Sequence, residues 1–297
     1  MLESADEVDS KSIASDGVRV QVPPPAPTWD FPRADRPCLS RAVYFYNFDG
    51  DFIMPEYSFE ALRNEIEICV SDEHKFGTDA FLLADFASPR HKDKVCDLGT
   101  GCGIVAVLMQ ISFAPQIIYG VDIQSQAIDQ LKITVEKNNL DSIIPVCADL
   151  KVLWKDAPAG SLDVVTCNPP YKAASAGIES LSEAQRIARH EIMCDINDVC
   201  HAASRLLKFG GKLCLCNRPE RLADVISAMK ANGIEPKELR FVNKDAESAP
   251  WLFLINGRKG GKPFMKVLPQ LYINGSEGFS DELLKIYGGG KTNDCRK

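Results

Sequence analysis

Residues 95–103 hold a short apolar run followed by a turn with glycine at every second position. The run Val-Cys-Asp-Leu at 95–98 is typical of a buried parallel strand. The apolar residues that follow, up to about Phe113, predict a helix. Glycine permits positive φ in a tight turn and lets a ligand approach the backbone. Because ligands of open α/β sheets bind at the carboxyl ends of the strands, the segment predicts an α/β fold with a ligand site at this turn.

Strands and helices alternate from residue 78 onward. Alternation of this kind implies a mostly parallel, doubly wound sheet with right-handed crossovers. A helix is predicted between Pro219 and Gly233, the usual proline-first and glycine-last arrangement. The other expected helices lie at 78–87, 104–113 and 196–208 and after a cap at Ser125. The expected strands lie at 95–98, 117–121, 143–147, 162–167, 212–216 (after a Gly210-Gly211 turn), 238–242, 251–255 and 266–273.

The N-terminal part differs from the rest of the chain. Six prolines fall between Pro23 and Pro37, and a segment so poor in apolar residues cannot offset its ordering entropy. We therefore expect residues 1–40 to be a flexible proline-rich arm and 41–297 to be a single domain. Alternating aromatic residues before Asp49-Gly50 predict a hairpin within an N-terminal extension at 41–75.

Acidic residues near the glycine turn favour one cofactor over another. The glycine spacing is G-x-G-x-G rather than the G-x-G-x-x-G of a dinucleotide site, and Asp97 precedes the first glycine by two residues. A carboxylate there would repel a pyrophosphate but suits an ammonium group, which favours S-adenosyl-L-methionine over NAD. Asp122 ends the second strand, where it can accept hydrogen bonds from ribose hydroxyls. Asp149 follows the third strand, within reach of an adenine amino group; helix or turn capping is the alternative for both residues.

The tetrapeptide Asn168-Pro169-Pro170-Tyr171 ends the fourth strand on the same edge of the sheet. A strand-ending turn explains one proline but not the combination. An exocyclic amine is a weak nucleophile because its lone pair is delocalised. The Asn168 side-chain oxygen and the Pro169 carbonyl can accept its two N–H groups and stabilise the charge that develops during methyl transfer. Tyr171 offers a face for stacking a flipped base or for contacting a flat amide. The tetrapeptide therefore predicts amino-methylation without a strong general base.

Composition excludes several classes of protein. No apolar run reaches the roughly 20 residues of a membrane span, and the acidic N-terminus is unlike a secretory signal. Eleven cysteines without a C-x-x-C pair predict free thiols in a reducing compartment, the cytoplasm. The grouping of His190, Cys194, Cys200 and His201 fits no zinc spacing, so we expect no metal site.

With these motifs the chain resembles class I S-adenosylmethionine-dependent methyltransferases of the N-P-P-Y amino-methylating group, and among them the bacterial tRNA(Val) adenine-N6 methyltransferase family. Less generic stretches carry the subfamily resemblance: HKFGTD at 74–79, IARHE at 187–191, RPERL at 218–222 and KGGKP at 259–263. The resemblance implies a seven-stranded Rossmann-like sheet whose last strand is antiparallel, and methylation of N6 of an anticodon-loop adenine. It implies cofactor contacts at Asp97, Gly99, Gly101, Gly103, Asp122, Asp149 and Asn168, and amine contacts at Asn168, Pro169, Pro170 and Tyr171.

Charge is divided unevenly along the chain. The net charge of −7 combines −12 over residues 1–171 with +5 over 172–297. The basic stretch at 258–262 lies in a run without acids, so Arg258, Lys259 and Lys262 are the predicted contacts to a tRNA backbone. A solvated loop between strands is the alternative for this stretch.

Two other substrate classes stay open. Methyltransferases that modify a glutamine amide of peptide-chain release factors share the tetrapeptide. They carry a helical N-terminal domain, whereas residues 1–60 here are proline-rich and then strand-like. An rRNA or DNA amino-methyltransferase is the other alternative.

Overall fold

The computed structural model describes residues 45–46, 52–53, 57–71, 74, 76–152, 154, 156–169, 194–276 and 278–288. By its internal contacts the chain divides into two compact units, Met1–Glu56 and Tyr57–Lys297. In the first unit, β1 (Phe45–Tyr46) and β2 (Phe52–Ile53) pair antiparallel, which agrees with the predicted hairpin. The predicted arm at 1–40 lies outside the described residues, and the domain boundary at residue 41 stays a prediction.

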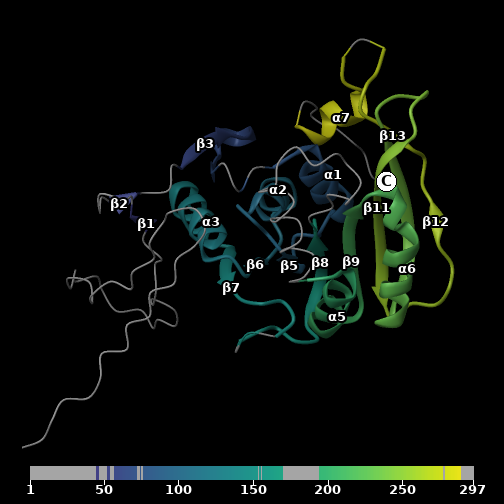
Figure 1. The fold of residues 1–297 in the computed structure, drawn as a ribbon, viewed down its shortest axis with the longest axis horizontal. Helices are drawn as coiled ribbons and strands as arrows, with labels where there is room; N and C mark the ends of the chain where they lie inside the picture. Colours follow the sequence, from purple (N-terminus) through teal and green to yellow (C-terminus); the bar gives the residue numbers. More distant parts are fainter. Residues whose placement is uncertain are drawn as a thin grey trace, which may run out of the picture. The chain divides into compact units, whose positions relative to one another are not determined.

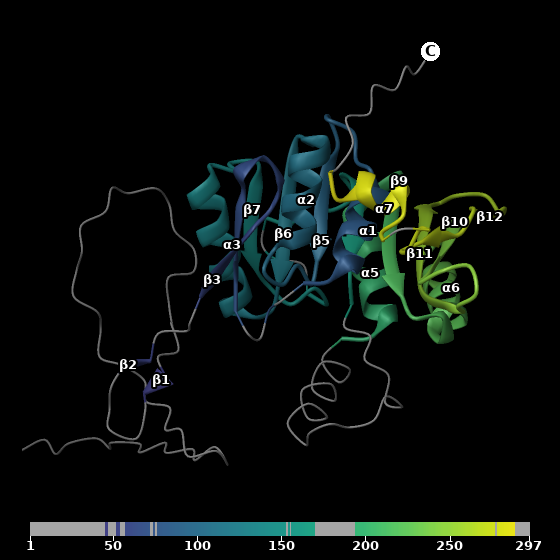
Figure 2. The same cartoon turned by 90° about the horizontal axis from the view of Figure 1, so that it is seen from above.

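The second unit is built on one mixed sheet (Figures 1 and 2). Its strands are β5 (Lys94–Leu98), β6 (Ile117–Asp122), β7 (Ile143–Cys147), β8 (Leu162–Cys167), β9 (Leu207–Asn217), β10 (Ile234–Asn243), β11 (Pro250–Lys259), β12 (Lys266–Val267) and β13 (Leu271–Tyr272). In space they follow the order β7, β6, β5, β8, β9, β11, β10, with the two short strands beside β10. Among the seven long strands only β11, the last in the chain, runs antiparallel to its neighbours β9 and β10. The predicted fold is confirmed.

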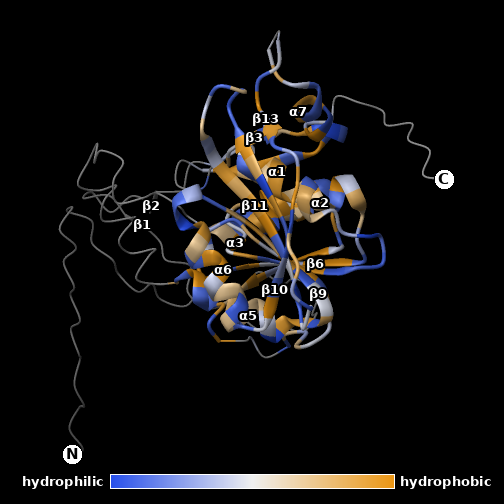
Figure 3. Ribbon diagram, turned by 90° about the vertical axis from the view of Figure 1, so that its right-hand side faces the viewer, coloured by the Kyte–Doolittle hydropathy of each residue, from blue (hydrophilic) through white to orange (hydrophobic). Residues whose placement is uncertain are grey.

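Helices cover both faces of the sheet (Figure 2). One face carries α1 (Thr78–Ala87), α2 (Ile104–Phe113) and α3 (Ser125–Asn138); the other carries α5 (Ile196–Leu206) and α6 (Leu222–Ala231). Neighbouring residues of a strand enter opposite cores: Val95 packs on the first face and Cys96 on the second. Since both faces are buried, the parallel strands are rich in apolar residues. Figure 3 gives the hydropathy of each residue along the ribbon. None of the described helices is long and apolar enough to cross a membrane.

Several expected elements differ from those observed. Ser125 is the first residue of α3 rather than its cap, and the Asp122 side chain accepts a hydrogen bond from the Gln124 backbone N–H instead. Gly210 and Gly211 lie within β9, where the register with β8 shifts, and do not form a separate turn. The expected strand at 266–273 is divided into β12 and β13, because Pro269 between them has no N–H for the ladder. The sequence analysis also missed the pair β3 (Ser58–Ala61) and β4 (Glu67–Val70) and the short helix α7 (Asp281–Ile286).

Candidate active site

The glycine turn joins β5 to α2 at the carboxyl edge of the sheet. Gly99, Gly101 and Gly103 have φ angles of +66°, +56° and +88°, so all three adopt the left-handed conformation that glycine favours. A Cβ at Gly103 would lie 2.2 Å from Cδ1 of the buried Leu131, and glycine here lets α3 pack against the turn. At Gly99 and Gly101 a Cβ would meet open space. The backbone of these two glycines is therefore accessible to a ligand.

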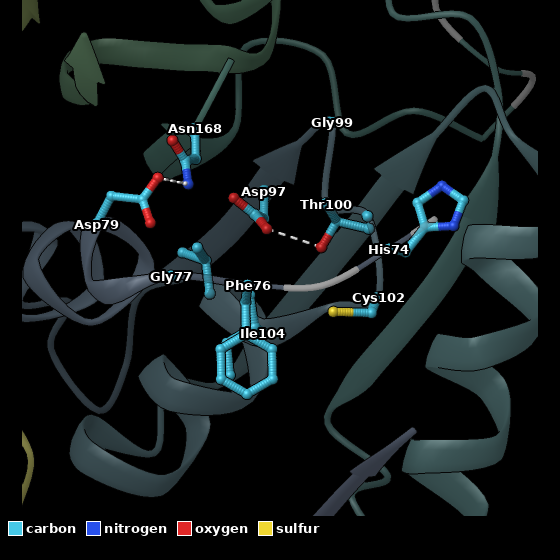
Figure 4. Close-up of a pocket in the computed structure, with 12 residues that line it drawn as sticks. His74, Phe76, Gly77, Asp79, Asp97, Gly99, Thr100, Cys102, Ile104 and Asn168 are labelled. Atoms are coloured by element: carbon cyan, nitrogen blue, oxygen red, sulfur yellow. Dashed lines mark hydrogen bonds between the residues drawn. The ribbon is translucent and has the colours of Figure 1, made fainter. Parts of the chain in front are cut away.

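A cavity of about 190 Å³ lies beside this turn. Three segments form its wall: the glycine turn, the residues just ahead of and within the first turn of α1, and the end of β8 (Figure 4). The cavity brings together Asp97, Gly99, Gly101 and Asn168, four of the residues predicted from the sequence. The cofactor motif and the amine motif thus meet in one cavity.

Asp97 is the buried acid of this cavity, with only 1% of its surface exposed. Its two carboxylate oxygens accept hydrogen bonds from the hydroxyls of Thr166 (2.6 Å) and Thr100 (2.7 Å). Burial raises the pKa of Asp97 to about 6, although the two hydroxyls oppose the shift. The group is therefore mostly ionised at neutral pH, and each oxygen keeps a further lone pair. A buried anion in the cavity wall suits a cationic ligand group.

Asp122 and Asp149 both bind backbone N–H groups. The carboxylate of Asp122 accepts from the N–H groups of Gly101 and Gln124, both at 2.9 Å, so it holds the glycine turn and the start of α3 together. Asp149 accepts from the Lys151 N–H at 2.9 Å. The capping role, which was the alternative for each acid, is thus observed. A carboxylate has about four acceptor positions, so a second role in cofactor binding is compatible with these contacts and stays a prediction.

Asn168 directly follows β8 and lines the cavity. Its Nδ2 donates to Oδ2 of Asp79 at 3.0 Å, and its Oδ1 accepts from the Cys216 thiol at 3.1 Å. Pro169 is described, whereas Pro170, Tyr171, His190 and the IARHE stretch lie outside the described residues. Within the described part of the chain, no three His, Cys, Asp or Glu side chains gather as a metal site requires.

Asp79 and His74 belong to the cavity wall and were not predicted as site residues from the sequence. The cap residue of α1 is Gly77, and the Asp79 carboxylate accepts a hydrogen bond from the side-chain amide of Asn168. Nδ1 of His74 is buried and has no hydrogen-bond partner among the described residues. Both belong to the HKFGTD stretch at 74–79, which carries the family resemblance but has no chemical pattern of its own.

The basic stretch at 258–262 lies at the amino edge of the sheet, the end at which the parallel strands begin. β11 runs antiparallel to β9, with Phe253 opposite Asn217 and Arg258 opposite Lys212. Arg258 is therefore five residues, or about 17 Å, from the end of β9 at the site. The Lys259 ammonium donates to the carbonyls of Ser204 and Leu207 at the end of α5, and Arg258 donates to the Gly210 carbonyl. These two cations stabilise the protein's own backbone.

Comparison with known families identifies the class of protein. The model of the methyltransferase small domain family matches residues 68–229, more than half of the chain. The chain therefore belongs to the methyltransferase small domain family. Its place in this family confirms the predicted class of enzyme, a methyltransferase, and the predicted cofactor, S-adenosyl-L-methionine. The glycine turn and the buried acid described above fit such a cofactor.

More particular relatives share one name. The tRNA1(Val) (adenine(37)-N6)-methyltransferase of Aeromonas salmonicida is 30% identical over 177 residues, which cover 59% of this chain and 71% of that protein. A protein of the same name from Histophilus somni (strain 129Pt) is 28% identical, with 53% of this chain and 65% of the relative covered. The chain thus spans about two thirds of their length. A crystal structure of a predicted O-methyltransferase from Agrobacterium tumefaciens matches with a TM-score of 0.58 at 20% identity, over 71% of this chain and 96% of that one, and supports the fold alone.

Proposed function

We propose that this methyltransferase transfers a methyl group to the exocyclic N6 of an adenine in tRNA, at the anticodon loop of tRNA(Val). The observation that carries the proposal is the position of Asn168, which lines the same cavity as Asp97 and the glycine turn. The shared name of the relatives supports the choice of adenine and of tRNA. About a third of each of those relatives lies outside the match. The site supports transfer to an amine, and the relatives' name supports adenine in tRNA as its carrier.

Cofactor binding is assigned to the turn and its acids. The Asp97 carboxylate pairs with the ammonium group of the cofactor. Because the space beside Gly99 and Gly101 is open, the cofactor can approach the backbone of these two glycines closely. Gly103 supports this arrangement through packing. Asp122 and Asp149 use their remaining acceptor positions for ribose and adenine, respectively. When bound, S-adenosyl-L-methionine supplies an electrophilic methyl group on a positively charged sulfur.

The end of β8 performs the amine chemistry. The target amine donates its two N–H groups to the Asn168 side-chain oxygen and the Pro169 carbonyl, and these acceptors stabilise the positive charge that develops on nitrogen. The nitrogen lone pair would form the new N–C bond while the bond between the methyl carbon and the cofactor sulfur breaks, and its electron pair would stay on the sulfur of the product S-adenosylhomocysteine. The methylated nitrogen would then release one proton to solvent. Two consecutive prolines restrict the backbone and hold the carbonyl in place. Pro170 as part of this turn and Tyr171 as a stacking surface stay predictions for the residues beyond 169.

The proposed tRNA contact at Arg258, Lys259 and Lys262 has weaker support. Two of the three cations donate to backbone carbonyls at the far edge of the sheet. A structural role in the fold accounts for the contacts of Arg258 and Lys259. The nine cysteines in the described part of the chain are free thiols, which agrees with the proposed cytoplasmic location, where tRNA is found.

One experiment separates the candidate substrates. The full chain is incubated with labelled S-adenosyl-L-methionine and, in separate reactions, with total tRNA, ribosomal RNA and a peptide-chain release factor. We expect label in tRNA, recovered after digestion as N6-methyladenosine. Label found only in the release factor, as methylated glutamine, or only in ribosomal RNA would contradict the proposal.

A further inference from the structure

The side-chain amide of Asn168 is held from two sides. Asp79, in the first turn of α1, accepts its Nδ2–H, and Cys216, near the end of β9, donates its thiol to Oδ1. The three residues come from three separate elements of the fold. Among the residues that the structure describes, these two are the hydrogen-bond partners of the Asn168 side chain. The amide therefore has one defined orientation in the cavity wall.

The chemistry of Asp79 decides which end of the amide faces it. An ionised carboxylate can only accept hydrogen bonds, so the NH2 group of Asn168 must point toward Asp79 and the carbonyl oxygen away from it. A flipped amide would place two acceptors against each other. Each carbonyl oxygen has two lone pairs, and the Cys216 thiol uses one of those on Oδ1. The other lone pair is left for a donor.

Local structure leaves room for the Asp79 carboxylate beside the cavity. The residue ahead of α1 is Gly77, and a Cβ there would lie 2.8 Å from Oδ1 of Asp79. The absence of a side chain at Gly77 thus leaves the volume that the carboxylate occupies beside the cavity (Figure 4).

We propose that Asp79 is a positioning residue that locks Asn168 with its carbonyl oxygen available to the substrate. The site then presents an acceptor, so it selects a target nitrogen that carries N–H groups and disfavours a carbonyl oxygen such as guanine O6. This inference rests on the proposed function, because it assigns to Asn168 the contact with the target amine. Asp79 itself acts through Asn168 and leaves the reacting atoms untouched.

The kinetic test compares Asp79→Ala and Asp79→Asn with the wild-type chain on the substrate that the wild type methylates. Misplacement of a positioned group by about 1 Å costs on the order of 100-fold in rate. For Asp79→Ala we therefore expect kcat to fall by about 10- to 100-fold. The KM for substrate and the Kd for S-adenosylhomocysteine should stay within about threefold. Asparagine at 79 can still accept from Asn168, so Asp79→Asn should retain more activity than Asp79→Ala. The matched control is Asp281→Asn, which removes an exposed first-turn carboxylate from α7.

Two results would overturn the proposal. One is a kcat for Asp79→Ala equal to that of the Asp281→Asn control. The other is a Kd for S-adenosylhomocysteine that rises in parallel with the loss of kcat, which would assign Asp79 to the cofactor.

A spectroscopic readout is independent of activity. The Asn168 side-chain NH2 resonances, assigned by their loss in Asn168→Ala, should be resolved and slow to exchange in the wild type and should collapse to solvent-exposed behaviour in Asp79→Ala. Unchanged resonances would overturn the contact itself. If the wild type methylates none of the substrates offered, the proposed function fails, whereas the spectra still decide whether Asp79 orders Asn168.

Discussion

The two edges of the central sheet use polar side chains in opposite ways. At the carboxyl edge, Asp97 and Asn168 line a cavity, and the glycines between β5 and α2 leave backbone exposed to it. At the amino edge, Lys259 and Arg258 turn toward the protein and donate to backbone carbonyls. The acidic half of the chain thus supplies the candidate site, and the most basic stretch of the chain supports the fold at the other end.

The two edges differ because helices end near the amino edge of the sheet and begin near its carboxyl edge. A helix that ends near the amino edge leaves its last carbonyls without partners, and the Lys259 ammonium satisfies two of those around the end of α5. At the carboxyl edge the glycine turn precedes the start of α2, and the cavity there is lined by polar side chains such as Asp97 and Asn168. A local excess of positive charge therefore does not by itself locate an RNA-binding surface.

The largest expected effect comes from Asn168→Ala at the carboxyl edge. Removal of one hydrogen-bonding group that stabilises transition-state charge costs about 100- to 1,000-fold in kcat, so methyl transfer should fall at least that far. The Kd for S-adenosyl-L-methionine, measured by calorimetry, should stay within a few fold of the wild-type value. Retained activity would show that the amine is bound by other residues. The carboxyl edge would then not differ from the amino edge by a catalytic role of Asn168.

The glycine turn allows a comparison of packing with ligand access. Gly103→Ala combines a left-handed backbone with a contact of 2.2 Å to Leu131, so we expect a loss of about 2–5 kcal/mol in the free energy of unfolding, measured in urea. Gly101→Ala carries only the backbone cost of about 1–2 kcal/mol, and it should weaken cofactor binding as well.

The control for Gly101→Ala is Gly160→Ala, since Gly160 has a φ of +65° and open space around a Cβ and does not line the cavity. Its stability loss should match that of Gly101→Ala, with cofactor affinity unchanged. Equal affinities of the two variants for the cofactor would argue against contact between Gly101 and the ligand.

The buried acid at the carboxyl edge predicts a pH dependence. The pKa of Asp97 is raised to about 6 in the folded protein, so the carboxyl group gains a proton as the pH falls through 6. Protonation removes the anion that pairs with the ammonium group, and cofactor affinity should fall by up to about tenfold per pH unit below 6. Calorimetric titration with S-adenosylhomocysteine from pH 7.5 to 5 measures this slope.

In Asp97→Asn the affinity at pH 7.5 should already be low and should not change with pH over this range. A wild-type affinity that is flat between pH 7.5 and 5 would mean that Asp97 does not meet a cationic group.

The smallest effects on catalysis are expected at the amino edge. Lys259→Met removes two hydrogen bonds to carbonyls near the end of α5 and should lower the free energy of unfolding by about 1–3 kcal/mol. Lys262→Ala should change stability by less than about 0.5 kcal/mol. For either variant we expect the KM for tRNA to stay within about twofold. A several-fold rise in the KM of Lys262→Ala that is largest at low salt and shrinks as the salt concentration increases would restore the basic stretch as an RNA contact.

Much of the fold follows from local patterns in the chain. The turn between β5 and α2 was predictable because three alternating glycines and the apolar residues around them determine backbone conformation within a few residues. The strand-ending position of Asn168 was predictable for the same reason, since proline cannot continue a central strand. The strand β4 and the helix α7 contact elements far away in the chain, α3 and α1 respectively, and left no comparable signal.

The sequence by itself determined the class of fold, the glycine turn and the residues that meet at the carboxyl edge, because these depend on short-range geometry and on the direction of parallel strands. Only the tertiary structure decided what each polar group touches. Asp79 reaches Asn168, and Lys259 reaches the end of α5, through segments that are far apart in sequence. Hydrogen bonds of this kind depend on how the helices pack on the sheet, and residue types along the chain do not encode that packing locally.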